Sequence, residues 1–183
     1  MSGFVLWFTG LSAAGKTTVG SLVARELEAR GLTVEMLDGD VIRTHLSQGL
    51  GYSKEDRDTN IARIGWVASR LARAGAAVVV SAISPYEEAR RRARALVAEH
   101  APFVEVHVAT SLEVCAARDP KGLYAKARSG EIEHFTGVSD PYEEPVSPEL
   151  RLDTDGREPA ESAASVLARL EDLQLVAARE AVT

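Results

Sequence analysis

The sequence has one cysteine in 183 residues, and it also lacks long apolar runs and long basic runs. A single thiol, Cys115, excludes an intrachain disulfide framework, and its apolar neighbours favour a small core residue. No apolar run approaches the roughly 18 residues that span a bilayer, and the short N-terminus without a basic leader is typical of a first strand. The formal net charge of −6 argues against nucleic acid and anionic membranes as partners. We therefore expect a cytoplasmic protein that binds neither nucleic acid nor membrane.

The chain does contain enough apolar residues, 45% of the total, to form the core of one domain. Short apolar runs that suit buried strands alternate with segments whose apolar residues recur at helical spacing. This alternation predicts an α/β fold in a single domain, 1–183, with a five-stranded parallel sheet covered by helices on both faces. The predicted strands are residues 4–9, 33–37, 76–83, 103–108 and 150–152.

Residues 119–148 break this alternation with glycine, proline and charged residues. A connection of this length inside a compact domain is usually a lid or a disordered segment. We expect it to be a mobile lid.

Several local features predict how individual helices begin and which way they face. Ser84 is expected to cap an Arg-rich helix that Pro85 opens, and residues 90–92 are expected to form its solvated face. Thr110 with Glu113 resembles a capping box. The four histidines show no metal-ligand spacing and are interpreted as structural: His45, His100, His107 and His134.

Residues 10–17 read GLSAAGKT and match the pattern G-x-x-x-x-G-K-[ST], between a predicted strand and a predicted helix. The N–H groups of such a P-loop surround phosphates, and the helix N-terminus adds positive potential. Lys16 is predicted to reach the β- and γ-phosphates, and Thr17 to hold Mg²⁺. The motif therefore predicts a P-loop NTPase fold with ATP and Mg²⁺ as cofactors. The predicted nucleotide-binding residues of this segment are Gly10, Ser12, Ala13, Ala14, Gly15, Lys16, Thr17 and Thr18.

Two carboxylates follow the second predicted strand, whereas the strand at 76–83 ends without one. Behind a P-loop, Asp38 and Asp40 are predicted to divide two roles, one holding Mg²⁺ and the other accepting the proton of the acceptor hydroxyl. We assign Mg²⁺ to Asp38 and the base to Asp40, although the sequence leaves the order open. A solvated Asp-Gly-Asp turn is the alternative. The arrangement resembles small-molecule kinases of the shikimate and gluconate type.

Six further blocks resemble the substrate segments of adenylyl-sulfate kinases, in that family's order: DGDVIR at 38–43, LGYS at 50–53, DRDTNIAR at 56–63, ISPY at 83–86, RDPKGLY at 118–124 and FTG at 135–137. The resemblance covers nearly the whole chain. It implies transfer of the ATP γ-phosphate to the 3′-hydroxyl of adenosine 5′-phosphosulfate, a step in sulfate activation. The substrate contacts that it implies are Asp40, Arg43, Tyr52, Arg57, Asn60, Ile83, Ser84, Lys121 and Phe135.

The chemistry of these residue types suits such a substrate. Tyr52 and Phe135 could sandwich the base, while Arg43 and Arg57 offer planar donors for phosphate and sulfate oxygens. Lys121 lies in the predicted lid, so we expect it to reach the site when the lid closes. Each residue also has a structural alternative: loop anchors for the two aromatic rings, surface charges for the two arginines, and a solvent-facing position for Asn60.

The resemblance also implies that Arg118 stacks on the adenine of ATP, unless it is an exposed structural arginine, and Arg157 is a further predicted nucleotide-binding residue. Three positions depart from the family: Ala13 for Gly, Val41 for Asn and Tyr52 for Phe. Ala13 suits the loop if its φ stays negative. Val41 removes a possible polar substrate contact.

Ser84 is predicted to contact substrate, since in-line transfer needs no phosphoenzyme, although a phosphorylated serine is the alternative. We expect a homodimer and a functional link to ATP sulfurylase. The chain starts near its first strand and in this resembles the kinase portion of fused sulfurylase–kinase proteins. A kinase of another nucleotide or of a sugar-like hydroxyl, and a non-catalytic nucleotide-binding subunit, are the competing hypotheses.

Overall fold

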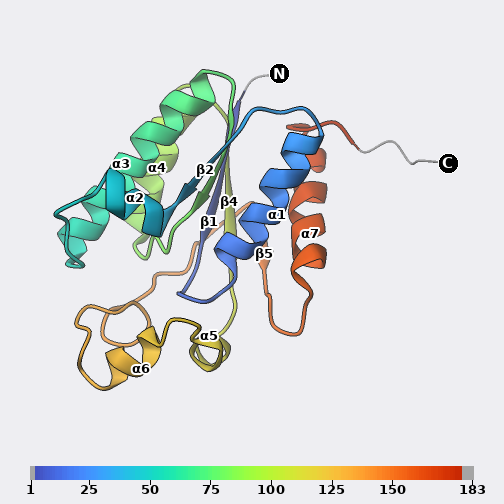
Figure 1. Ribbon diagram of the computed structural model, residues 1–183. Helices are drawn as coiled ribbons and strands as arrows, with labels where there is room; N and C mark the ends of the chain where they lie inside the picture. The colour runs from blue at the N-terminus through green and yellow to red at the C-terminus, as the bar shows by residue number, and fades with distance from the viewer. Residues whose placement is uncertain (1–2, 179–183) are drawn as a thin grey trace.

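The computed structural model describes residues 3–178 and contains one five-stranded parallel sheet, in the order β2-β3-β1-β4-β5 (Figure 1). The predicted fold class is confirmed, and each predicted strand is present with small shifts at its ends. The strands are β1 (Phe4–Thr9), β2 (Val34–Asp38), β3 (Ala77–Ser81), β4 (Phe103–Val108) and β5 (Leu150–Leu152).

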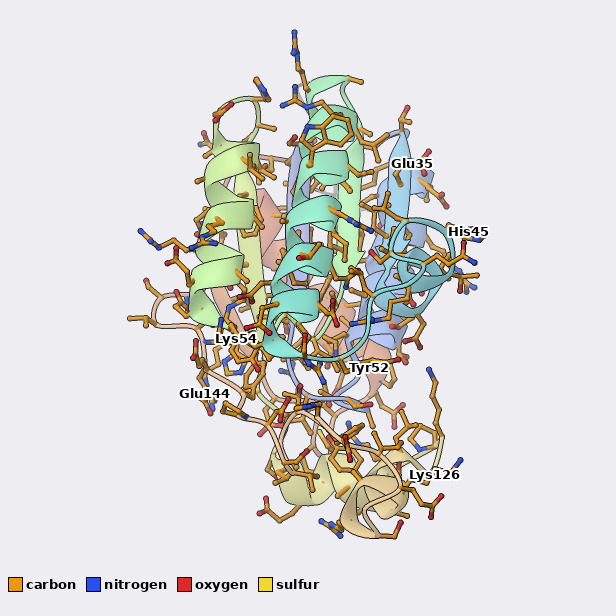
Figure 2. All side chains as sticks on the ribbon, turned by 90° about the vertical axis from the view of Figure 1, so that its left-hand side faces the viewer. Glu35, His45, Tyr52, Lys54, Lys126 and Glu144 are labelled. Carbon is orange, nitrogen blue, oxygen red and sulfur yellow. The ribbon has the colours of Figure 1, made fainter. Side chains whose placement is uncertain are left out.

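Helices cover both faces of this sheet. Helices α1 and α7 pack together on one face, and α3 and α4 pack together on the other, where they stand in front of the sheet in Figure 2. The short α5 and α6 form a lobe beyond one end of the sheet (Figure 1). The helices are α1 (Lys16–Ala29), α2 (Gly39–His45), α3 (Lys54–Arg73), α4 (Glu87–Ala98), α5 (Leu112–Arg118), α6 (Leu123–Arg128) and α7 (Pro159–Asp172).

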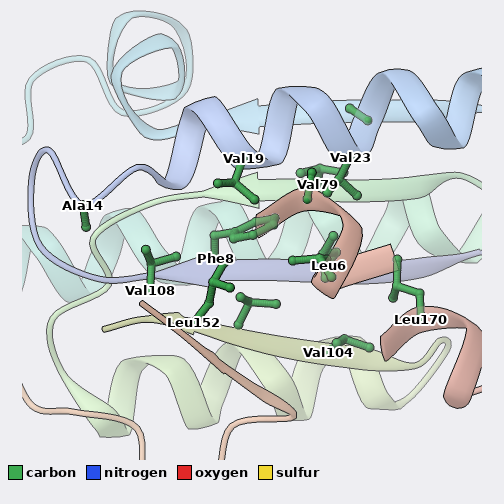
Figure 3. Close-up of a cluster of buried hydrophobic side chains, with 14 of the residues drawn as sticks. Leu6, Phe8, Ala14, Val19, Val23, Val79, Val104, Val108, Leu152 and Leu170 are labelled. Atoms are coloured by element: carbon green, nitrogen blue, oxygen red, sulfur yellow. The ribbon is translucent and has the colours of Figure 1, made fainter. Parts of the chain in front are cut away.

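Strand β1 lies at the centre and divides the core in two. Its residues Phe4, Leu6 and Phe8 pack toward α1 and α7, as Figure 3 shows for Leu6 and Phe8, whereas Val5 and Trp7 pack toward α3 and α4. Successive side chains of a strand point to opposite faces, so a strand buried on both faces is apolar throughout. This explains why the strand is one continuous apolar run in the sequence.

The carboxyl ends of the strands meet at one edge of the sheet because all five run parallel. The P-loop follows β1 there, Asp38 ends β2, and Ser81 ends β3. In open α/β sheets ligands bind outside this edge. The fold therefore brings the segments that the sequence singled out to one place.

Three local predictions are wrong. Helix α4 begins at Glu87 with Tyr86 at its N-cap, so Ser84 caps nothing. Arg90 is 2% exposed, because α4 packs on α3 and β4 and turns this side chain inward. Helix α5 is capped by Ser111 and not by Thr110, whose hydroxyl instead pairs with Thr154.

None of the helices within residues 3–178 is both long and apolar enough to cross a membrane.

Candidate active site

A cavity of about 860 Å³ opens at the carboxyl edge of the sheet, between the P-loop and the lobe formed by α5 and α6. Nearly all the predicted site residues line it. Two P-loop residues, Gly10 and Ala14, are not part of the lining, and both are buried. The predicted site residues on the cavity wall are Ser12, Ala13, Gly15, Lys16, Thr17, Thr18, Asp38, Asp40, Arg43, Tyr52, Arg57, Asn60, Ile83, Ser84, Arg118, Lys121, Phe135 and Arg157.

The P-loop leads into α1 through residues with positive φ. Gly15 is the N-cap of α1, with a φ of 105°. It has no side chain to cap the helix, so no side chain occupies the first amide groups of α1, which face the loop. Such a helix start is an anion site. Ala13 also has a positive φ, 59°, so the condition under which alanine would suit this loop is not met. The left-handed conformation costs an L-residue about 1–2 kcal/mol.

Lys16 is buried at the start of α1, and its ammonium group is folded back onto the loop. Its Nζ donates to the carbonyl oxygens of Gly10 at 3.0 Å and Leu11 at 2.7 Å. Burial lowers the pKa of Lys16 to about 8, against the opposing effects of Cys115, Asp38 and Asp40. The side chain is thus held at the phosphate-binding loop in an environment that weakens its charge.

The predicted Mg²⁺ ligands lie side by side. The Thr17 hydroxyl donates to Asp38 Oδ2 at 2.8 Å, and Asp38 Oδ1 accepts the Asp40 amide at 3.0 Å as the N-cap of α2. A hydroxyl and a carboxylate at one point, next to a phosphate-binding loop, are the hard oxygen ligands that Mg²⁺ prefers. The donor set fits the ion.

The carboxylate of Asp40 also lines the cavity, but its partner lies outside this pair. Its carboxylate is 74% exposed and forms an ion pair with Lys121 of the lobe. The same contact raises the pKa of Lys121. Lys121 was expected to approach only on lid closure, and in this structure it already reaches the cavity.

The other half of the cavity has two arginines around Tyr52, which lies in the loop before α3 (Figure 2). The guanidinium carbon atoms of Arg43 and Arg57 lie 4.3 Å and 5.5 Å from the centre of the Tyr52 ring. Arg57 is buried, donates to the carbonyl oxygens of Tyr52 at 2.9 Å and of His134, and has a pKa lowered by burial. Arg57 is therefore not an ordinary surface charge.

Asn60 and Phe135 complete this half. Asn60 is buried with its Oδ1 unpaired, which rules out the solvent-facing alternative. Phe135 is also buried and packs edge-on against Tyr124, with ring centres 5.0 Å apart. Phe135 is thus both a core anchor and part of the cavity wall, while Val41, exposed to solvent, lies outside the wall.

Ser84 joins β3 to α4 with a φ of 48°, which is unusual for a residue other than glycine. Its Oγ accepts the indole N–H of Trp7 at 3.0 Å, and its carbonyl accepts Arg90 at 2.6 Å. The side chain is buried at the cavity wall, where its hydroxyl is already engaged.

On the nucleotide side, Arg118 and Arg157 lie near the turn between β5 and α7. Arg118 donates to both the Oγ1 and the carbonyl of Thr154 at 2.8 Å, and Arg157 donates to Ser165 at 3.0 Å. Thr154 lines the cavity and donates to the Ala14 carbonyl at 2.8 Å. The sequence prediction missed Thr154, although the Asp-Thr-Asp-Gly turn after β5 was a usable signal.

A phosphate-binding loop that shares one cavity with an exposed carboxylate and an arginine-lined second half suits transfer of a phosphoryl group between two bound molecules. The fold and the site are those of a P-loop kinase that acts on a small molecule. The model of the adenylylsulphate kinase family matches residues 2–153, and the chain belongs to this family.

Similar proteins agree on the family. An adenylyl-sulfate kinase of Picosynechococcus sp. is 52% identical, over 93% of this chain and 95% of the relative. A probable bifunctional SAT/APS kinase 2 of Sorangium cellulosum is 55% identical over 99% of this chain, which spans only 31% of that relative. A structure of the Mycobacterium tuberculosis APS kinase CysC in complex with AMPPNP and APS superposes with a TM-score of 0.90, at 48% identity, over 93% of this chain and 98% of the other.

Proposed function

We propose that this chain transfers the γ-phosphate of ATP to the 3′-hydroxyl of adenosine 5′-phosphosulfate, as an ATP-dependent adenylyl-sulfate kinase. The observation that carries the proposal is the two-part cavity: a P-loop at one end, arginines and aromatic rings at the other, and Asp40 between them. The similar M. tuberculosis structure, in complex with both AMPPNP and APS, supports a site that takes these two kinds of molecule.

In the nucleotide half, the amide groups of the P-loop and of the first turn of α1 bind the phosphates. Lys16 exchanges its two carbonyl partners for the β- and γ-phosphates, which favour its charged form. Thr17 and Asp38 would hold Mg²⁺, which neutralises charge on these phosphates. Arg118 and Arg157 lie at the edge of the cavity where the adenine ring of ATP would bind.

In the acceptor half, Asp40 accepts the proton of the 3′-hydroxyl, because it is the exposed carboxylate between the two halves. Arg43 and Arg57 pair with the phosphate and sulfate oxygens, and Asn60 supplies a buried oxygen that has no other partner. Phe135 and Tyr52 contact the base. Lys121 leaves Asp40 for the anionic substrate, which frees the carboxylate to act as a base.

We further propose that the earlier part of the segment 119–148 closes over bound nucleotides. We also propose that the chain acts in the cytoplasm as a homodimer with a functional link to ATP sulfurylase. The relative named as a probable bifunctional SAT/APS kinase supports the link to sulfurylase, because this chain matches only 31% of that relative. Light scattering of the purified protein measures the oligomeric state, and a pull-down with purified ATP sulfurylase tests the link.

The central test is coupled detection of ADP with adenosine 5′-phosphosulfate as sole acceptor and Lys16→Ala as the inactive control. Adenosine should be a very poor acceptor, because an uncharged molecule leaves Arg43, Arg57 and Lys121 unpaired in a closed site. AMP, which has no sulfate, should fall between the two. Faster phosphorylation of adenosine or of a sugar alcohol would overturn the substrate assignment and leave a kinase of another class.

A further inference from the structure

Arg90 is the most deeply buried charged side chain among the described residues, and the sequence pattern gave no sign of it. Its neighbours Arg91 and Arg92 lie in solvent and pair with Glu88. Arg90 instead points inward from the first turn of α4. Its Nε lies 3.1 Å from Glu105 Oε1, in an ion pair that lacks hydrogen-bond geometry. One of its two terminal nitrogens, Nη2, pairs with the Glu87 carboxylate.

The remaining donors of Arg90 reach two backbone carbonyls. One terminal nitrogen donates to the carbonyl oxygen of Ser84 at 2.6 Å, and the other donates to that of Glu143 at 2.7 Å. The planar guanidinium group is suited to this, because it presents several donors in a fixed geometry. A single buried side chain therefore joins the β3–α4 connection to the end of the segment 119–148.

The Ser84 carbonyl belongs to a residue whose backbone is in an unfavourable conformation, with a φ of 48°. Such conformations persist only where the surrounding structure holds them, and they are frequent at ligand-binding positions. Besides Arg90, Ser84 is held by the bond from the Trp7 indole to its hydroxyl, at 3.0 Å, and by the Thr9 hydroxyl, which donates to its carbonyl at 3.4 Å. At 2.6 Å, Arg90 makes the shorter of the two hydrogen bonds to the Ser84 carbonyl.

The Glu143 contact is part of a second anchor. The Glu143 amide donates to the Pro85 carbonyl at 2.8 Å, and its carboxylate accepts the amide of Glu87 at 2.7 Å. Next to it, the Tyr142 hydroxyl pairs with Thr9 at 2.9 Å. The chain at 142–143 is thus fixed to the same connection that presents Ser84 to the cavity.

We propose that Arg90 is a positioning residue for the acceptor half of the site: it holds Ser84 in its left-handed conformation and ties it to Glu143. The proposal rests on the proposed function, since Ser84 lines the half of the cavity assigned to the acceptor. Arg90 touches no substrate and acts through Ser84.

The first experiment replaces Arg90 by lysine, which keeps the charge but cannot reach both carbonyls and Glu105 together. We expect KM for adenosine 5′-phosphosulfate to rise roughly tenfold or more, with KM for ATP nearly unchanged. Val97→Ala is the matched control, because Val97 is a fully buried residue at the other end of α4. It should lower stability without separating the two KM values. Equal changes in both KM values for Arg90→Lys would overturn the proposal.

A second variant separates positioning from charge balance. Arg90→Met with Glu105→Gln removes both buried charges, while Arg94 keeps its pair with Glu149 at 2.8 Å. If Arg90 serves only to neutralise Glu105, this double variant should restore KM for the acceptor, and that result would sink the proposal. If Arg90 positions Ser84, KM should stay raised although the protein is stable.

A third comparison tests the backbone directly. Ser84→Gly and Ser84→Ala remove the same hydroxyl, but only glycine adopts a positive φ without strain. The penalty of Arg90→Lys should therefore shrink in the glycine background and persist in the alanine background. Equal penalties in the two backgrounds would contradict a role in holding φ.

A readout without substrate keeps this inference distinct from the proposed function. The chain has two tryptophans, and Trp66 is exposed, so Trp66→Phe leaves Trp7 as the sole tryptophan, which excitation at the red edge selects over tyrosine. Because Trp7 donates to Ser84, Arg90→Lys should shift its emission, whereas Leu170→Ala, in the core cluster on the other face of the sheet, should not. An unchanged spectrum would overturn the proposal even if the protein phosphorylates its acceptor as expected. A shifted spectrum in a protein that does not use adenosine 5′-phosphosulfate would uphold the positioning role and refute only the substrate.

Discussion

At the scale of single residues, the charge of Lys16 depends on what fills the cavity. Its ammonium group is buried with two carbonyl partners, and its pKa falls to about 8. Phosphates at the same place favour the charged form, so nucleotide binding should raise this pKa. Binding and protonation of Lys16 are therefore coupled.

This coupling predicts the pH dependence of ATP affinity. Below pH 8 the free protein already carries the charge, so affinity should change little with pH. Above pH 8, affinity should fall by up to about tenfold per pH unit, with proton uptake on binding. Calorimetry in buffers of different ionisation enthalpy measures both. Lys16→Arg, which stays charged, should show no such fall; the same fall in that variant would assign the effect to another group.

The two carboxylates should have separable roles. Asp40→Asn should lower kcat by about 10²–10⁴-fold without changing the Mg²⁺ concentration required, because Asp40 is the carboxylate that faces the cavity. Asp38→Asn should raise the Mg²⁺ requirement, since Asp38 is bonded to Thr17. Steady-state kinetics over a Mg²⁺ series distinguishes the two. The opposite pattern would exchange the assignments.

At the scale of elements, the two parts of the segment 119–148 are attached to different places in the molecule. Residues 142–149 are held by Thr9, Arg90 and Arg94, and Glu149 also accepts the Glu105 amide at 2.6 Å. The earlier part of the segment holds α6 and lies in the projecting lobe (Figure 1), and it is attached to the site itself, through Tyr124 to the Ser12 carbonyl at 2.9 Å and through the His134 carbonyl to Arg57. We therefore expect any lid movement to be confined to 119–141, a shorter range than the sequence predicted.

Limited tryptic digestion tests this boundary. Lys126 and Arg128 of α6 are exposed and should be cut in the free protein, whereas Arg151, exposed but paired in the sheet, should resist. An ATP analogue with adenosine 5′-phosphosulfate should protect α6. Mass spectrometry of the fragments locates the cuts. Equal cleavage with and without both ligands would count against a lid.

At the scale of the whole molecule, the core cluster on the α1 and α7 face of the sheet can be changed without changing a residue that lines the cavity. Leu170 of α7 is fully buried in the cluster with α1 (Figure 3) and does not line the cavity. Leu170→Ala should lower the free energy of unfolding by about 2–5 kcal/mol, from lost burial and the cavity left behind. Urea denaturation measures this, and both KM values should stay unchanged at temperatures where the variant is folded. A selective rise in one KM would show that α7 packing also shapes the site.

Local patterns in the sequence were enough to predict the sheet, the helices that cover it and the P-loop, but not the short α6, which lies in the segment interpreted as an irregular lid. A strand buried on both faces is an unbroken apolar run, and the P-loop needs its glycines and lysine at set spacings. The acceptor residues were predicted through their resemblance to a family, and the structure brings them together at the cavity. The spacing of apolar residues in a strand or a helix repeats within a few residues, so it can be recognised in a single sequence.

Only the tertiary structure decided the environment of individual side chains. Arg90 and Arg91 are the same residue type in one run, yet packing of α4 on β4 buries the first against Glu105 and leaves the second in solvent. Likewise, the positive φ values of Ala13 and Ser84 depend on contacts with distant segments, such as Trp7 and Arg90 for Ser84. Burial and backbone strain are set by neighbours far along the chain, so no local pattern contains them.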